Sequence, residues 1–480
     1  MFRPLRFFAL LCAMVALPVA RAQTFANKGL VGVGRVADSK KDKFGETFGS
    51  LSGLALDLRT LQRNASGSTY AVTLYAQPDR GYVKSGVTTN YRPRRHRFTL
   101  AFNPDNNGSS SQNQLDLTLS DTTLFTESSG ASLTSLDPSP TASGARAGFS
   151  FALPQSAQSA GGRLSIDSEG LGLLADGTFF VCDEYGPYLY RFSATGVLLS
   201  ATRPPEALIP RRNNQDSFSS DSPGAGQPAA SPSQPTSGRE NNKGFEGLSV
   251  SADGRTLYAL MQAATRQDGG AGNLGQNRFA RLLAYDITNP AAATLTGEWV
   301  LPLPFYPDGS NIQQVAESHE LVALSATKFL VLATDGVGRG SSPSNSRYRA
   351  VLVFDTASAT NIAGTSVDNA ATPLAQNGVL ANNITAATST VLIDLNDATQ
   401  LAKFGLNNNA NDNSDTLAGK WESLALLPAL DATTPDDFFL LIGNDNDFST
   451  SDGFQDGAAF NASPNIDTMI LAYRVTLPGT

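Results

Sequence analysis

Four glutamates recur in the chain in similar short motifs, each at the start of an apolar segment. They are Glu169, Glu246, Glu320 and Glu422. Several carboxylates that share a small volume cannot all be ionised without a counter-charge. A hard divalent cation bound by oxygen ligands supplies that charge, and Ca²⁺ suits such irregular sites best. The pattern therefore predicts a calcium site where the fold brings the four glutamates together.

Further acids stand at the ends of the strands that follow these glutamates. In an antiparallel hairpin, the first residue of one strand lies beside the last residue of the next. Acids at strand ends also accept hydrogen bonds, so the alternative is that the glutamates tie neighbouring sheets together. On the first interpretation, the predicted metal ligands are Glu169, Asp183, Glu246, Glu320, Asp335, Glu422, Asp445 and Asp447.

The elements that would position these acids form a repeat. A small or acidic signature, an apolar strand, a turn and a second apolar strand recur five times, and turns such as Asp176-Gly177 indicate hairpins. Three or four antiparallel strands per unit are typical of a β-propeller blade. We therefore predict an all-β fold, a β-propeller of five or six blades, with Lys28 to Val36 as the source of a sixth. The five units begin at Leu51, Ser168, Phe245, His319 and Trp421.

The units are longer than a compact blade. Glu169 and Glu246 are 77 residues apart, whereas a blade takes roughly 40–50 residues. Long polar loops account for the excess, and we expect surface insertions at about Asn103–Gly162, Asn213–Gly238 and Asn407–Asp415 within a single domain of residues 23–480.

Composition excludes several classes of protein. Hydrophobic residues make up 41% of the chain and charged residues 16%, which favours a globular protein over a disordered or coiled-coil one. The formal net charge of −8, without a basic run, argues against nucleic-acid binding. The chain has two histidines, too few for a histidine-rich zinc site. We expect His96 on an exposed outer strand and His319 in a structural role beside Glu320.

Residues 1–22 have the pattern of a secretory signal peptide. A basic start and a short apolar run precede Ala20-Arg21-Ala22, which fits a cleavage site. No other apolar stretch is long enough for a membrane span, so we expect a protein that is secreted or periplasmic after cleavage near Ala22. Cleavage removes three arginines and no acid, which lowers the net charge to −11. The mature chain keeps one cysteine, Cys182, so no internal disulfide forms, and we expect a buried, inert thiol.

Several longer strings in the chain are distinctive. They are Asp167–Leu171, Cys182–Phe192, Asn242–Leu248, Ser318–Leu324, Lys420–Glu422 and Asp445–Phe448. These strings resemble the secreted family known as "esterase-like activity of phytase", or phytase-like propellers. They cover roughly residues 50–475 in the expected order, and the Asp-Glu-Tyr-Gly-Pro and Asp-Asn-Asp-Phe strings are the most specific. One departure is Ala333-Thr334, where the family often has Glu-Arg, and this puts a basic phosphate contact there in doubt.

The resemblance implies a metal-dependent hydrolase of small phosphoesters, with Ca²⁺ as the cofactor. It implies catalytic roles for Glu169, Asp183, Glu246, Glu320 and Glu422, and substrate contacts for Arg80, Arg191 and Lys243. We also expect a monomeric protein. Two other classes stay open. Lactonase-like propellers that hydrolyse carboxylic esters also place acids around a central calcium, and an exported propeller can serve binding alone.

Overall fold

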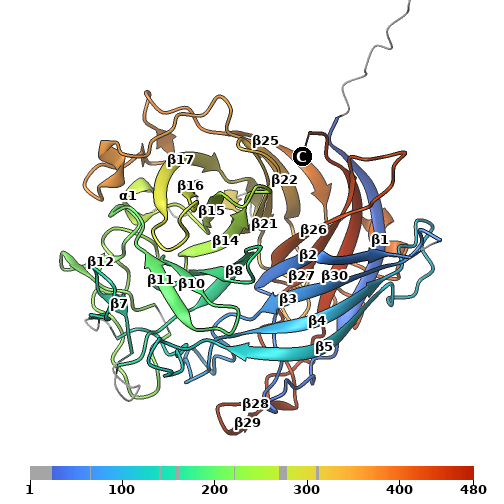
Figure 1. The fold of residues 1–480 in the computed structure, drawn as a ribbon, viewed down its shortest axis with the longest axis horizontal. Helices are drawn as coiled ribbons and strands as arrows, with labels where there is room; N and C mark the ends of the chain where they lie inside the picture. The colour runs from blue at the N-terminus through green and yellow to red at the C-terminus, as the bar shows by residue number, and fades with distance from the viewer. Residues whose placement is uncertain are drawn as a thin grey trace, which may run out of the picture.

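A computed structural model describes residues 24–64, 66–139, 143–156, 162–220, 222–269, 278–309 and 313–479. The proposed signal peptide lies outside the described residues. Strands account for 44% of the structure and helices for 3%, which confirms an all-β fold. The strands form a ring of four-stranded antiparallel sheets, a β-propeller (Figure 1).

The described chain contains five such sheets, and each is one blade. In four of them the strands follow the order of the sequence from the inside of the ring outward. The first blade contains β2 (Gly53–Arg63), β3 (Tyr70–Gln77), β4 (Arg94–Phe102) and β5 (Leu115–Leu124). The second contains β8 (Ser168–Leu173), β9 (Phe179–Asp183), β10 (Leu189–Phe192) and β11 (Leu198–Thr202). The third contains β14 (Phe245–Val250), β15 (Thr256–Met261), β16 (Phe279–Asp286) and β17 (Thr294–Pro302), and the fourth β20 (Glu317–Ala323), β21 (Lys328–Thr334), β22 (Arg349–Asp355) and β25 (Thr388–Asp394).

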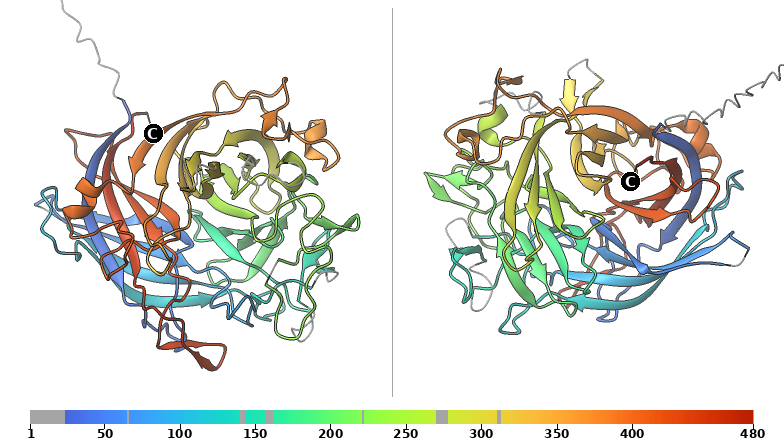
Figure 2. Two further views of the ribbon diagram at one scale, coloured as in Figure 1. Left: turned by 180° about the vertical axis from the view of Figure 1, so that it is seen from behind. Right: turned by 45° about the horizontal axis from the view of Figure 1, so that its top comes forward.

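The fifth blade joins the two ends of the described chain. Its inner strands are β26 (Trp421–Pro428), β27 (Asp437–Asn444) and β30 (Thr468–Thr476), and its outermost strand is β1 (Ala26–Val36). Both views of Figure 2 show blue β1 beside the red C-terminal strands. The segment from Lys28 to Val36 therefore completes the fifth blade and forms no sixth one, because the free edge of β30 accepts it in antiparallel register.

Glycines let the inner strands of neighbouring blades approach closely. A Cβ atom on Gly170 would lie 2.6 Å from the amide nitrogen of Leu248 in the next blade, and one on Gly247 would lie 2.9 Å from the amide nitrogen of Leu321. No side chain fits at such distances. The glycine of the recurring Glu-Gly-Leu motif is thus explained by contact between blades.

The hydrophobic core consists of layers between adjacent blades. One layer joins the fourth and fifth blades through Leu332, Val351 and Ile442. Cys182 lies fully buried in the layer between the second and third blades, as expected for an inert thiol. Because each layer needs two blades, closing the ring adds the last layer and completes the core.

Shorter elements lie in the connections between blades. The expected insertion Asn103–Gly162 contains β5, which pairs with β4 through alternating leucines, so part of that segment belongs to a blade. No helix in the described ranges is long and apolar enough to cross a membrane. The two-stranded sheets are β6 (Ser143–Gly144) with β7 (Leu153–Pro154), β12 (Arg211–Arg212) with β13 (Gln215–Asp216), β18 (Phe305–Pro307) with β19 (Gln313–Val315), β23 (Ala375–Gln376) with β24 (Val379–Leu380), and β28 (Gly453–Gln455) with β29 (Ala458–Phe460); the helices are α1 (Arg266–Gly269), α2 (Ala398–Ala402) and the 3₁₀ helix η2 (Ser366–Asp368).

His96 is buried, contrary to the expectation of an exposed strand. It lies on β4, its Nδ1 is 2.9 Å from the Thr122 hydroxyl, and its ring packs edge-on against Phe48. Burial and the nearby Arg94 guanidinium lower its pKa well below the usual value, so the ring stays neutral. The basic residues around it had suggested a solvated strand, but the side chains of Arg94 and Arg95 are themselves buried.

Candidate functional site

A cavity of about 300 Å³ opens where the inner strands begin. Seven of its lining residues are acids and two are cations, so it would hold five negative charges if every acid were ionised. The acids are Asp79, Asp167, Glu169, Glu184, Glu246, Glu422 and Asp447, the cations are Arg80 and Lys420, and Gly81, Val83, Asn242 and Gln262 complete the lining.

β-Bulges direct the side chains of the inner strands towards the cavity. In the third blade Phe245 pairs with Met261 and Gly247 with Leu260, which leaves Glu246 as the extra residue. Glu422 is the extra residue in the fifth blade, and a similar irregularity of register occurs around Glu169 in the second. A bulge re-aims a side chain in this way, so three blades each present one glutamate to the same space.

The fourth blade departs from this pattern by one residue. Its bulge lies between Ser318 and Glu320, so His319 occupies the position that a glutamate has in the other three blades. The Nδ1 of His319 is 3.7 Å from Glu422 Oε1, and its Nε2 is 3.1 Å from the Thr334 hydroxyl. Burial and the charges of Lys420 and Lys243 lower its pKa to about 3, so the imidazole is neutral.

Glu320 does not line the cavity, contrary to the sequence prediction. Its Oε1 accepts hydrogen bonds from the backbone N–H groups of Leu248 (2.8 Å) and Leu321 (2.9 Å). Glu320 occupies the position that Gly170 and Gly247 have in the second and third blades, where the inner strands of neighbouring blades come close together. Its carboxyl group bridges the third and fourth blades. The structural alternative raised for all four glutamates therefore describes this one.

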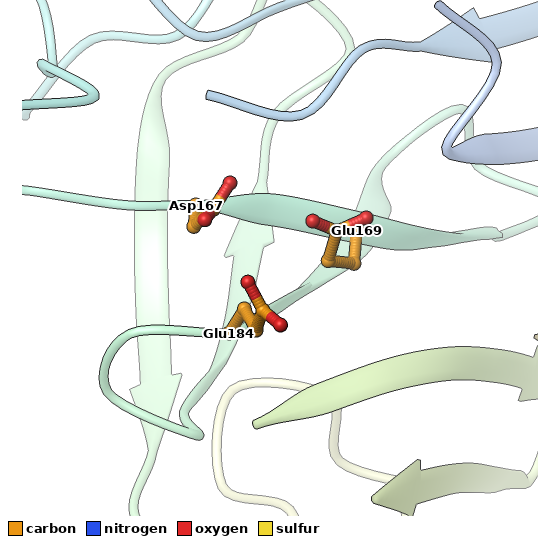
Figure 3. Close-up of side chains that lie close together, drawn as sticks. All are labelled: Asp167, Glu169 and Glu184. Carbon is orange, nitrogen blue, oxygen red and sulfur yellow. The ribbon is translucent and has the colours of Figure 1, made fainter. Parts of the chain in front are cut away.

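The densest group of acids is Asp167, Glu169 and Glu184, which we call the acid triad. Each offers a carboxylate oxygen, and these oxygens all lie within 4.8 Å of one another. Asp167 and Glu169 flank the start of β8 and Glu184 follows β9, and Figure 3 shows the three side chains gathered around one space. One buried oxygen of each residue has no hydrogen-bond donor among the described residues: Asp167 Oδ1, Glu169 Oε2 and Glu184 Oε1.

Burial and mutual repulsion make the ionised state of these acids unfavourable. Burial raises the pKa of Glu169 well above its usual value, and the carboxylates of Glu246, Asp167 and Glu422 raise it further. Burial likewise raises the pKa of Glu246, followed by the effects of Glu184 and Glu422. Such a site binds either protons or a cation of higher charge.

Two cations in the wall offset part of the negative charge. Arg80 lies with a guanidinium nitrogen 3.4 Å from Asp167 Oδ2 and donates a hydrogen bond to the Asn242 side chain. The Lys420 ammonium lies 2.9 Å from Asp447, 3.3 Å from Asp445 and 3.5 Å from Glu422. The two cations therefore pair with different acids: Arg80 with Asp167, and Lys420 with Glu422, Asp445 and Asp447.

Three further predicted metal ligands lie at or behind this wall. Asp447 lines the cavity, whereas Asp445 lies behind it in contact with Lys420. Asp183 is fully buried and accepts backbone N–H donors from Asp167, Tyr185 and Gly186, each at 3.0 Å. Burial raises its pKa to about 7, and its two oxygens hold the turn that presents Glu184.

The structure does not bring the remaining predicted residues into the cavity. Asp335 accepts hydrogen bonds from the Ser346 hydroxyl (2.9 Å) and the Arg347 backbone (2.6 Å), which organises a turn. Arg191 contacts Asp176 in the turn at the opposite end of its blade, 3.4 Å away. Lys243 forms an ion pair with Glu317 outside the lining. Arg191 pairs with Phe180, close to the turn at Asp176-Gly177, so it lies at the end of the blade away from the cavity.

Sequence reasoning gave no role to Asp79, Asp167, Glu184, Asn242, Gln262 and Lys420. All six stand next to predicted residues in the quoted strings or at the predicted hairpin ends, as Asp167 does in Asp167-Ser168-Glu169. Alignment of the repeats on Leu171, Leu248, Leu321 and Leu424 was the signal that would have placed His319, rather than Glu320, beside the other glutamates.

Comparison with known proteins supports the family assignment. The profile of the family described as "Phytase-like: Esterase-like activity of phytase" matches residues 46–448. An uncharacterized secreted protein of Arthroderma benhamiae is 36% identical over 475 residues, covering 92% of each chain. Solved structures are more distant. Pseudomonas fluorescens PhoX in complex with vanadate is 11% identical with a TM-score of 0.32, and the match covers 94% of this chain and 97% of that one. A gluconolactonase from Xanthomonas campestris is 9% identical with a TM-score of 0.27, and the match covers 96% of this chain and 99% of that one. Such low scores say nothing about chemistry. The chain belongs to the phytase-like family, whose profile covers the first four blades and the two inner strands of the fifth.

Proposed function

We propose that the protein is an exported hydrolase of phosphoesters that uses a divalent cation, with Ca²⁺ as the first candidate. The observation that supports this most strongly is the acid triad, a group of buried carboxylates each with one oxygen that has no hydrogen-bond donor among the described residues. The family description, which names an esterase-like activity of phytase, is consistent with it. Export is supported by the signal-like residues 1–22 and by the relative described as secreted.

The residues present fit a hard cation. Carboxylate oxygens are the ligands that Ca²⁺ and Mg²⁺ prefer. Asp167, Glu169 and Glu184 each offer one oxygen within 4.8 Å of the other two, close enough to share one ion. Glu246 and Glu422 face the same cavity from two other blades. The acid triad would therefore hold the cation, with these two glutamates available to a second ion or to the substrate.

The chain's own side chains supply the remaining functions of a hydrolase. Arg80 and Lys420 are the cations in the lining, and they would bind the oxygens of a phosphoryl group while Asn242 orients Arg80. Glu246 faces the same cavity, and its carboxylate would accept a proton from the attacking water. A bound divalent cation would contribute Lewis-acid polarisation of the phosphoryl group and a lowered pKa of the attacking water.

A two-substrate assay tests the proposal. The purified protein is given para-nitrophenyl phosphate or para-nitrophenyl acetate, with Ca²⁺ or with EDTA. We expect hydrolysis of the phosphate ester in Ca²⁺, its loss in EDTA and its return when Ca²⁺ is added in excess. Hydrolysis of the acetate alone would favour a carboxylic-ester hydrolase, and hydrolysis of neither would favour a binding protein.

Two variants separate a catalytic effect from a general loss of structure. Glu246→Gln should lower kcat for the phosphate ester by about 100-fold or more, the scale on which loss of a catalytic acid or base acts. Asp116→Asn is the matched control, because Asp116 is exposed on the outer strand β5. Equal activities of the two variants would contradict a catalytic role for Glu246.

A further inference from the structure

A second cavity, of about 450 Å³, lies next to the acid cavity, and we call it the aromatic groove. Its wall contains the rings of Tyr82 and Phe460, the small side chains of Ala458 and Ala459, and one charge of each sign on Lys84 and Asp456. Its size is in the usual range for a ligand pocket. The groove is far less charged than the acid cavity.

One short segment separates the two cavities. Along Asp79–Lys84, Asp79, Arg80, Gly81 and Val83 line the acid cavity, whereas Tyr82 and Lys84 line the aromatic groove. The segment is fixed from the groove side, because Gln455 Oε1 accepts the backbone N–H of Tyr82 (2.8 Å) and its Nε2 donates to Thr89 (2.6 Å). The two cavities are therefore neighbours, and the segment Asp79–Lys84 lies between them.

The rings in the groove are held in place. Tyr82 and Phe460 stack at 4.0 Å between centroids with planes 11° apart. Phe460 belongs to the hairpin of β28 and β29, which extends beyond the ring of blades at the bottom of Figure 1. A Cβ atom on Gly453 would lie 2.2 Å from the Phe460 ring, so glycine is required there for the ring to lie flat. Fixed rings bind an apolar ligand at low entropic cost.

We infer that the aromatic groove binds the alcohol part of the ester, and that the preferred substrates are phosphomonoesters of aromatic, fused-ring alcohols. The inference rests on the proposed function, which places the phosphoryl group in the acid cavity. A phosphomonoester has an anionic phosphoryl end and an organic end. The acid cavity, with its cations, matches the first, and the aromatic groove matches the second. With Lys84 and Asp456, the groove lining has no net charge, so a second phosphate gains little there and a neutral ring system is the complementary occupant.

Binding of two phosphonates tests the inference without turnover. The full mature chain in Ca²⁺ is titrated calorimetrically with 1-naphthylmethylphosphonate and with methylphosphonate, which differ only in the ring system. We expect the naphthyl compound to bind more tightly to wild type. Phe460→Ala should weaken its binding by about 3- to 10-fold, as expected for loss of one aromatic contact, and should leave methylphosphonate binding unchanged.

Phe454→Ala is the matched control. It removes a ring from the same hairpin, but Phe454 is exposed and does not line the groove, so both affinities should stay at the wild-type value. Tyr82→Leu serves as a second variant if Phe460→Ala does not fold. Equal wild-type affinities for the two phosphonates, or equal losses for both in Phe460→Ala, would overturn the inference.

Hydrolysis of 1-naphthyl phosphate and glycerol 2-phosphate separates this inference from the proposed function. The ratio of wild-type to variant kcat/KM is compared for each ester, because intrinsic reactivity cancels in that ratio. Hydrolysis of both esters with equal ratios for Phe460→Ala overturns the groove alone. Selective phosphonate binding without hydrolysis of any ester overturns the proposed function alone, and failure of both readouts overturns both.

Discussion

Replacement of Glu246 by Gln should change the stability of the protein in opposite ways with and without Ca²⁺. In EDTA the substitution removes one carboxylate from a cavity whose acids already raise one another's pKa, so the variant should be at least as stable as wild type. In Ca²⁺ it removes one of the carboxylates that face the cation. The variant should then gain less from calcium than wild type does.

The size of the effect follows from linkage. Calcium at a hundredfold excess over its Kd stabilises the folded state by about 2.7 kcal/mol. An unfolding entropy of about 2.1 cal/mol/K per residue, over roughly 450 residues, makes each kcal/mol worth about 1 °C. Wild type should therefore gain about 3 °C in Tm. A tenfold weaker Kd, about 1.4 kcal/mol, would leave the variant a gain of about 1.5 °C.

Differential scanning fluorimetry of wild type, Glu246→Gln and the exposed control Asp116→Asn, each in EDTA and in millimolar Ca²⁺, measures these shifts. The control should gain as much from calcium as wild type. An identical gain for all three proteins would refute the assignment of Glu246 to the cation site. A wild-type Tm that is the same in EDTA, calcium, magnesium and manganese would refute the cation site itself.

Three further outcomes follow from the site. Burial raises the folded pKa of the cavity acids, and that of Asp183 to about 7, so the metal-free protein should lose stability as pH rises from about 4 towards 7. Cation binding must displace the protons on these acids, so the calcium-induced gain in Tm should be larger at pH 8 than at pH 5. A gain that does not depend on pH would contradict proton release. Glu320→Ala should lower the free energy of unfolding by about 2–3 kcal/mol, since it leaves the N–H groups of Leu248 and Leu321 without their acceptor. In urea denaturation, Glu320→Gln keeps an acceptor oxygen and should therefore have a clearly higher free energy of unfolding than the alanine variant. Equal losses in the two variants would contradict the bridging role. Arg191→Ala should leave phosphate-ester hydrolysis unchanged, because the guanidinium contacts Asp176 at the far end of the blade; a fall in kcat/KM would show that this placement is wrong.

The sequence was sufficient for the repeat and for the inner strands, because both depend on local patterns. Leucines two positions after Glu169 and Glu246, followed by tight turns, predict hairpins whatever the rest of the chain does. The five units found by this pattern are the five blades of the structure. The outer strands were harder to find: β5 lies half exposed in a polar segment, and only its pairing with β4 distinguishes it from a loop.

The site was predicted in part, for a different physical reason. Which acid enters the cavity depends on the position of a β-bulge, and a shift of one residue exchanges His319 for Glu320. Asp79, Asp167 and Glu184 follow or precede strands, so their directions are set by turns rather than by strand alternation. Burial of Arg94 likewise depends on partners far away in the sequence, Asp42 and Glu46.

The pairing of β1 with β30 makes the two ends of the described chain interdependent during folding. Val36 pairs with Thr468, so the contacts between these strands join residues more than 400 positions apart. Closing so large a loop costs entropy that no local hairpin repays. Four blades can assemble in the order of the sequence, but the fifth has to wait for the C-terminal strands before β1 finds its partner. Damage at the two ends therefore exposes the same blade: without β1 the outer edge of β30 is left unpaired, and without β30 both β1 and β27 lose a partner.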